Sequence, residues 1–263
     1  MALMSKRLLT GLVIGFTALF ALMAGGLYLT ALVLTIVVLA AKEYTEILKH
    51  KGFLPSFKII LASSLIFASL AYFKRFDLVP LAFTVSSIMA FMWVLFRGKQ
   101  PYIANVATTI LGFVYCGWFP LHLLFLRDYP NGASYAIMLF FAVIITDSFC
   151  YYVGCKYGKH KLSPVISPNK TIEGSIGGTL ACILFCLIFG YALQIELYHA
   201  FFLGLIIATF AQIGDLCESM IKREAGVKDS SNILPGHGGF LDRTDSYILT
   251  IPVVYYYLQF FVI

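Results

Sequence analysis

The segment AFFLGLIIATFAQIGDLCES, residues 200–219, combines a long apolar run with two acidic residues near its end. A bilayer core is crossed by about 20 mainly apolar residues in helical form, and this segment has that length. Asp215 and Glu218 are spaced to share one face of such a helix, with Ser219 beside them. The segment therefore predicts a transmembrane helix that carries oxygen ligands near one end.

The composition of the whole chain agrees with this reading. Of its 263 residues, 60% are hydrophobic and 12% are charged, whereas a soluble domain is about 25% charged. We expect one membrane-embedded domain over residues 1–263, with N-terminal helices in 1–130 and catalytic helices and loops in 131–263. The net charge of +6 is spread over short loops rather than gathered in one patch, which predicts no binding of nucleic acid.

Further apolar segments predict an all-α transmembrane bundle of about nine helices. Residues 1–22 also resemble a signal peptide, because Lys6 and Arg7 precede an apolar run. A second apolar run follows at once, after Gly25 and Gly26, so we expect the first run to be retained as a membrane helix. The nine expected spans are residues 8–24, 27–41, 57–72, 78–96, 103–126, 134–153, 176–193, 200–219 and 247–262.

The distribution of basic residues gives the orientation. Cytoplasmic loops collect lysine and arginine, and a cytoplasmic N-terminus places all but three of the nineteen basic residues on the inner side. The exceptions are Lys74, Arg75 and Arg127. We therefore expect the N-terminus inside, the C-terminus outside and the loops at 154–175 and 222–245 on the cytoplasmic face.

Acidic residues inside apolar segments point to function, because each costs about 2.5–3.5 kcal/mol at mid-bilayer. Asp147, Asp215 and Glu218 are such residues. Carboxylates supply the hard oxygen ligands that Mg²⁺ prefers, and Asp215 and Asp242 are the first choices, with Asp245 and Glu218 as helpers. Two other interpretations remain open: a polar helix end at Asp147, and a proton or ion pathway at Asp215 and Glu218.

The loop at 222–245 mixes cationic, acidic and glycine residues within 24 positions. Lysine and arginine neutralise phosphate, and glycines let backbone N–H groups approach an anion closely. Lys222 and Arg223 could instead anchor the inner face, and the glycines and His237 could form a simple turn. In the loop at 154–175, Ser167-Pro168 disfavours helix, and Thr171 or Asn169 could cap the next helix, whose N-terminus would attract an anion. A simple capped turn is the alternative there.

These residues together resemble the phosphatidate cytidylyltransferase (CDP-diacylglycerol synthase) family. The resemblance is carried by residues 219–245, which read SMIKREAGVKDSSNILPGHGGFLDRTD, and further upstream by Asp147, Ser167-Pro168 and Lys170-Thr171. It is detailed over the C-terminal half and reduces to a hydrophobic pattern over the N-terminal half. The resemblance implies a nine-helix bundle, dependence on a divalent metal and metal-binding aspartates at Asp215 and Asp242.

The expected activity is transfer of the cytidylyl group of CTP to phosphatidic acid, giving CDP-diacylglycerol and pyrophosphate for phospholipid biosynthesis. The expected partners are CTP, phosphatidic acid and the lipid bilayer, in a bacterial inner membrane, with Mg²⁺ as cofactor and room for a second cation; a homodimer is allowed. Catalytic roles are expected for Asp215, Asp242, Lys222, Arg223 and Asp245. Metal contacts are expected from Asp215, Asp242, Glu218 and Asp147. Substrate contacts are expected from Ser167, Pro168, Lys170, Glu173, Lys228, Asp229, His237, Gly238, Gly239 and Arg243.

Two rival classes remain to be separated by experiment. A transporter or channel also uses intramembrane acids, but it does not need a loop dense in lysine, arginine and glycine. A CTP-dependent polyprenol or phytol kinase joins CTP to a membrane alcohol and would release CDP rather than pyrophosphate. The D-G-x-x-A-R run typical of CDP-alcohol phosphotransferases does not occur in the sequence.

Overall fold

The computed structural model describes residues 2–231, 233 and 238–262, and it is almost entirely helical. The helices are α1 (Ala2–Ala24), α2 (Gly26–Lys49), α3 (Phe57–Tyr72), α4 (Val79–Arg97), α5 (Tyr102–Gly112), α6 (Phe119–Arg127), α7 (Gly132–Tyr157), α8 (Ile172–Ala192), α9 (Leu197–Glu224) and α10 (Leu241–Phe261). A 3-10 turn, η1 (Phe76–Leu78), precedes α4, and a π-helical turn, η2 (Phe113–Trp118), joins α5 to α6. An antiparallel hairpin of β1 (Lys161–Ser163) and β2 (Ser167–Thr171) lies between α7 and α8. The predicted all-α class is confirmed.

Each of the nine predicted apolar segments falls on helical structure, and the segment 103–126 covers α5, η2 and α6 together. Within the described part of the chain, six helical stretches are long and apolar enough to cross a membrane, which makes the chain an integral membrane protein. They are Gly26–Lys49, Phe76–Arg97, Tyr102–Arg127, Gly132–Tyr157, Ile172–Ala192 and Leu197–Glu224. Shorter apolar helices cover Gly11–Ala24 and Phe57–Tyr72. The total of nine spans stays a prediction.

The chain divides into two compact units. Unit 1 comprises Met1–Phe125 and Lys222–Thr244, and unit 2 comprises Leu126–Ile221 and Asp245–Ile263. Helices α9 and α10 therefore each contribute residues to both units. The single membrane domain and the boundary after residue 130 that the sequence predicts both stay predictions.

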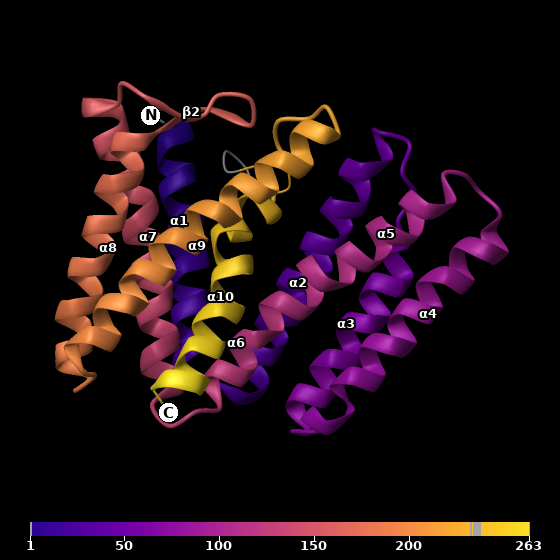
Figure 1. The fold of residues 1–263 in the computed structure, drawn as a ribbon, viewed down its shortest axis with the longest axis horizontal. Helices are drawn as coiled ribbons and strands as arrows, with labels where there is room; N and C mark the ends of the chain where they lie inside the picture. The colour runs from indigo at the N-terminus through magenta and orange to yellow at the C-terminus, as the bar shows by residue number, and fades with distance from the viewer. Residues whose placement is uncertain (1, 232, 234–237, 263) are drawn as a thin grey trace. The chain divides into compact units, whose positions relative to one another are not determined.

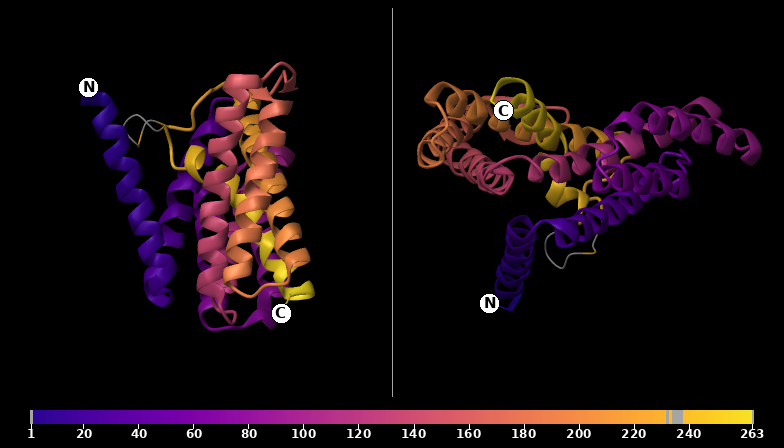
Figure 2. Two further views of the ribbon diagram at one scale, coloured as in Figure 1. Left: turned by 90° about the vertical axis from the view of Figure 1, so that its left-hand side faces the viewer. Right: turned by 90° about the horizontal axis from the view of Figure 1, so that it is seen from below.

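In unit 1, α1 and α2 meet at a turn made by Gly25 and Gly26 (Figure 2). Both glycines have positive φ, 65° and 49°, which a residue with a Cβ adopts only at a cost. The core contains an aromatic cluster in which the ring of Phe67 lies 4.7 Å from that of Phe83 and 5.0 Å from that of Trp118. This packing fixes α3 and α4 against the π-helical turn η2.

In unit 2, α7 and α8 run side by side in both views (Figures 1 and 2). Small buried residues recur every four positions along one face of α8, at Gly174, Gly178, Cys182, Cys186 and Gly190. Such a stripe lets two backbones approach closely in a membrane protein, and a Cβ on Gly178 would lie 2.8 Å from the carbonyl oxygen of Thr146 on α7. The opposite face of α8 exposes large apolar side chains, Leu180, Leu184 and Ile188, which suit contact with lipid.

The predicted loop at 222–245 is shorter in the structure, because helices extend into it from both ends. Helix α9 continues to Glu224, so Lys222 and Arg223 lie in its last turn, where basic side chains are favoured by the helix dipole. Gly226, with φ of 73°, then turns the chain out of the helix. Asp242 lies in the first turn of α10, where an acid is favoured by the positive end of the dipole.

Candidate functional site

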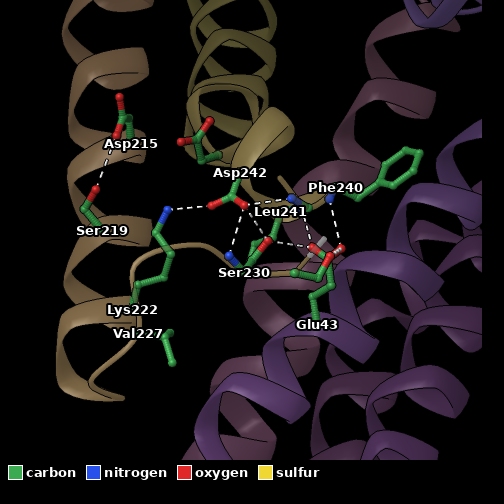
Figure 3. A network of polar contacts seen from close by, with 12 residues as sticks. Glu43, Asp215, Ser219, Lys222, Val227, Ser230, Phe240, Leu241 and Asp242 are labelled. Atoms are coloured by element: carbon green, nitrogen blue, oxygen red, sulfur yellow. Dashed lines mark hydrogen bonds and ion pairs between the residues drawn. The ribbon is translucent and has the colours of Figure 1, made fainter. Parts of the chain in front are cut away.

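Asp242 organises the connection between α9 and α10 within unit 1. Its Oδ2 atom accepts hydrogen bonds from the Ser230 backbone N–H at 3.0 Å, the Ser230 hydroxyl at 2.8 Å and the Gly239 backbone N–H at 2.8 Å. Its Oδ1 atom accepts a hydrogen bond from the Lys222 ammonium group at 2.6 Å (Figure 3). Oδ2 therefore holds Ser230 and Gly239 in place, while Oδ1 faces the positive charge of Lys222.

The ion pair between Lys222 and Asp242 is nearly buried, with side chains 11% and 9% exposed. Burial by itself raises the pKa of the Asp242 carboxyl, but hydrogen bonds from Lys222 and from two backbone N–H groups outweigh it. The net pKa of Asp242 lies below its ordinary value. Asp242 is therefore a carboxylate at neutral pH, in a position where it can attract a cation.

Glu43, on α2, is a functional candidate that the sequence analysis missed. Its side chain is completely buried, and both of its oxygens accept hydrogen bonds from residues of unit 1. Oε1 accepts hydrogen bonds from the Ser231 hydroxyl at 2.6 Å and the Phe240 N–H at 2.9 Å. Oε2 accepts them from the Ser230 hydroxyl at 2.9 Å and the Leu241 N–H at 2.8 Å (Figure 3). Glu43 thus caps the start of α10 from a helix at the other end of the chain.

A sequence signal for Glu43 does exist. The buried face of α2 includes Ala40, Tyr44 and Ile47, which recur at the spacing of a helix face. Glu43 falls on this same face, whereas Glu46 falls on the exposed face. An acid on the apolar face of a membrane helix needs hydrogen-bond donors or a positive charge beside it. A search of residues 27–49 for an acid on the apolar face would have selected Glu43.

Four acidic residues come near one another in unit 2. Asp245 lies within electrostatic range of Asp215, Glu218 and Asp147. They are contributed by three helices, α7, α9 and α10. Glu218 is completely buried, while Asp147 is exposed on α7. Asp215, Glu218 and Asp147, three of the four predicted metal contacts, thus belong to unit 2 together with Asp245, while the predicted metal site itself stays a prediction.

A lysine from the hairpin pairs with this acidic group. Lys170, on β2, places its Nζ atom 2.7 Å from Oδ2 of Asp215, and the Ser219 hydroxyl lies 3.5 Å from Oδ1 of the same aspartate. The next residue, Thr171, is the N-cap of α8, since its hydroxyl accepts the Gly174 N–H at 3.2 Å. The predicted cap is confirmed at Thr171, and it fixes where the strand that carries Lys170 ends.

Glu173 stabilises the base of the hairpin. Its Oε2 atom accepts the backbone N–H of Lys159 at 3.0 Å and that of His160 at 3.2 Å, and Oε1 lies 2.6 Å from Nδ1 of His160. These contacts give Glu173 a local structural role in the described chain. Its predicted contact with substrate stays a prediction.

The other predicted site residues lie around these two clusters. Arg223 donates to the Val227 carbonyl oxygen at 3.2 Å, and Gly238 has φ of 80°, where a Cβ would lie 2.7 Å from Oδ2 of Asp242. His237 lies outside the described residues. Four predicted substrate contacts are exposed, Pro168, Lys228, Asp229 and Arg243, while Ser167 is partly exposed.

The structure thus brings the predicted residues together in two groups. Unit 1 gathers Lys222, Gly239 and Asp242, and unit 2 gathers Lys170 with the four acids. Because Asp215 and Asp242 belong to different units, their predicted shared metal site stays a prediction. Among residues 2–231, 233 and 238–262, no three His, Cys, Asp or Glu side chains are arranged to hold a metal ion on their own.

Comparison with known proteins identifies the family. The chain matches the model of the cytidylyltransferase family over residues 5–261. A phosphatidate cytidylyltransferase of Synechocystis sp. is 33% identical over 94% of both chains, and one of Bacillus subtilis is 32% identical over 98% of both. The chloroplastic phosphatidate cytidylyltransferase 5 of Arabidopsis thaliana is 31% identical over 97% of this chain and 71% of its own length. With a family match that runs through α1 to α10 and includes both charged clusters, the chain belongs to the cytidylyltransferase family.

Proposed function

We propose that this protein transfers the cytidylyl group of CTP to phosphatidic acid, giving CDP-diacylglycerol and pyrophosphate. The observation that carries the proposal is the end-to-end similarity to relatives named phosphatidate cytidylyltransferase. The apolar helices support it, because phosphatidic acid keeps its acyl chains in the bilayer. The charged clusters support it further, because both contain the carboxylates and lysines that triphosphate chemistry needs.

The reaction requires little covalent help from the protein. A phosphate monoester has a second pKa of about 6, so the lipid phosphate is largely a dianion at neutral pH and can attack the α-phosphorus of CTP directly. The new P–O bond forms as the bond to the pyrophosphate oxygen breaks. Catalysis then consists of positioning the two phosphates and stabilising their negative charge.

Lysines in the two clusters are suited to that charge. Lys222 and Lys170 each hold an ammonium group against an aspartate, at 2.6 Å and 2.7 Å. A phosphate oxygen offers the same hard anionic acceptor as a carboxylate oxygen. We propose that Lys222, Arg223 and Arg243 neutralise phosphate beside Asp242, and that Lys170 does so beside Asp215.

The donor set also fits Mg²⁺. This ion is usually held by one or two carboxylates, with substrate phosphates and water completing its shell, so it does not require a cage of three protein ligands. As the sequence predicts, Asp215 and Asp242 are the proposed ligands, with Glu218 and Asp147 as further metal contacts and Asp245 as a helper. When bound, Mg²⁺ would supply charge stabilisation for the triphosphate. A second cation is allowed by the number of carboxylates.

We further propose that the site faces the cytoplasm, where CTP is found, from a bacterial inner membrane. Relatives from bacteria support this location. A homodimer stays a prediction from the sequence.

The identity of the released product tests the proposed function. Purified protein in mixed micelles of detergent and phosphatidic acid should convert CTP into lipid-linked cytidylate and equimolar pyrophosphate. A CTP-dependent kinase would instead release CDP, and a transporter would leave CTP intact. Asp215→Asn should abolish cytidylate incorporation while leaving the protein in the membrane fraction, and Glu46→Gln, an exposed acid on α2, should behave as the parent chain. Release of CDP without pyrophosphate would refute the proposal.

A further inference from the structure

We propose that Glu43 is a positioning residue for nucleotidyl transfer, which sets the place of Asp242 by holding the α9–α10 loop and the start of α10. The proposal rests on the function proposed above. It assigns an active-site task to α2, a helix that lies in the N-terminal half of the chain, where the family resemblance in the sequence is only a hydrophobic pattern.

Glu43 is surrounded by hydrogen-bond donors. A carboxylate has no hydrogen to donate, so it needs donors around both oxygens when it is buried. Two donor groups lie within 2.6–2.9 Å of each Glu43 oxygen, and one of the four, the Ser230 hydroxyl, has a single hydrogen that it shares with Asp242. Two of the donors are backbone N–H groups at the start of α10, and two are serine hydroxyls of the loop. Ser230, Ser231 and the start of α10 are therefore held in place against α2.

Glu43 is linked to Asp242 through Ser230. The Ser230 hydroxyl lies 2.9 Å from Oε2 of Glu43 and 2.8 Å from Oδ2 of Asp242, so the two carboxylates share one hydroxyl group. Asp242 also follows directly after Leu241, whose N–H donates to Glu43. A shift of the loop away from Glu43 would therefore move both the donors to Asp242 and the backbone that carries it.

Gly239 packs tightly against Glu43. A Cβ at Gly239 would lie 2.5 Å from Oε2 of Glu43 and would overlap the Ser230 hydroxyl. The backbone at Gly239 is thus packed directly against the carboxylate of Glu43. Backbone so close to a buried anion leaves little freedom for the N–H of Gly239, which is itself a donor to Asp242.

Glu43→Gln is the sharpest test, because it keeps the size and shape of the side chain while removing its negative charge and one of its two acceptor oxygens. The amide has one acceptor oxygen, so in either orientation its NH₂ group faces the N–H of Phe240 or of Leu241, and neither N–H can turn away. Loss of such an outer partner costs about 10–100-fold in activity or metal affinity. We expect kcat/KM for CTP to fall by that factor, with the KM for phosphatidic acid unchanged, and Glu46→Gln to match the parent chain.

A second readout needs no substrate. Amide hydrogen exchange at Phe240 and Leu241 should speed up by at least about tenfold in Glu43→Gln, while exchange in α3 and α8 stays at the parent rate. A residue that merely packs α2 would lower the melting temperature without this selective change. Should Glu43→Gln fail to fold, Ser231→Ala replaces it, since it removes one donor to Glu43 and leaves Ser230 in place.

The double variant completes the test. Ser231→Ala alone should lower kcat/KM for CTP by about three- to tenfold, the worth of one hydrogen bond. If Ser231 acts through Glu43, adding this change to Glu43→Gln should cost nothing further. Fully additive losses, parent-level kcat/KM in Glu43→Gln, or unchanged exchange at Phe240 and Leu241 would each overturn the inference. If the parent chain itself formed no CDP-diacylglycerol, the proposed function would fail, while the exchange experiment would still decide the position of the loop.

Discussion

Replacing Asp242 by asparagine separates the two roles of its carboxylate, which holds Ser230 and Gly239 through one oxygen and carries a negative charge beside Lys222. The asparagine oxygen can keep the three contacts that Oδ2 makes with Ser230 and Gly239. The NH₂ group then takes the place of Oδ1, which in the parent chain lies 2.6 Å from the Lys222 ammonium group. Two donor groups therefore face each other in the variant. The variant therefore loses one charge-assisted hydrogen bond in a nearly buried place. Such a bond contributes about 1.5–3 kcal/mol to stability.

We expect Asp242→Asn to keep its helical content and to lose about 1.5–3 kcal/mol of stability. Its rate of cytidylate transfer should fall by far more than the roughly 10–100-fold that is typical when a group hydrogen-bonded to a metal ligand is removed. Lys222→Met removes the same hydrogen bond but keeps the carboxylate, so its activity should fall less. Thermal unfolding followed by circular dichroism measures the first quantity, and pyrophosphate release measures the second.

A matched control comes from Asp77, which pairs with Arg75 through two hydrogen bonds at the protein surface. Asp77→Asn removes an aspartate charge from an exposed ion pair, so its melting temperature and turnover should stay close to those of the parent chain. The reasoning about Asp242 would be refuted if Asp242→Asn turned over CTP at the parent rate, or if Asp242→Asn and Lys222→Met had equal activity.

Two further substitutions test the geometry of the loop and of the hairpin. In Gly239→Ala the new Cβ would lie 2.5 Å from Oε2 of Glu43, so Gly239 and Glu43 must move apart. We expect CTP turnover to fall at least about tenfold, the scale seen when a group that orients a metal ligand is lost. Wild-type turnover would contradict the tight packing at Gly239. Lys170→Met should raise the KM for CTP about tenfold or more, the worth of one charge-assisted hydrogen bond, because Lys170 reaches Asp215 from the hairpin. Lys161→Met, an exposed lysine on the same hairpin, is its control, and an equal effect of both lysines would point to general charge rather than to position.

The sequence was sufficient for the helices because their signal is simple. An apolar run of membrane length has few alternatives, and every run recognised in the sequence falls on helical structure. The ends of the helices were less accessible. Charged residues such as Lys222 and Asp242 suggest a loop by composition, yet both lie within terminal turns, where the helix dipole favours their charges.

The two strands of the hairpin could not be predicted in this way. Strands of three and five residues, β1 and β2, are too short to show an alternating pattern. Their position depends instead on contacts such as that between Glu173 and His160, which compositional reasoning does not reveal. The aspartates were accessible because an acid in an apolar segment is conspicuous, whereas their lysine partners required the folded structure.

Glu43 has a consequence for the order of events during synthesis. Its donors lie 187–198 residues further along the chain. At roughly 5–20 residues per second, about 10–40 seconds separate the emergence of this acid from that of Ser230. Throughout that interval α2 carries a carboxylate without the hydroxyl and N–H groups that later surround it. The nascent chain must therefore keep Glu43 near water or another donor until its last helix arrives, and a message truncated before residue 230 would leave it in that state permanently.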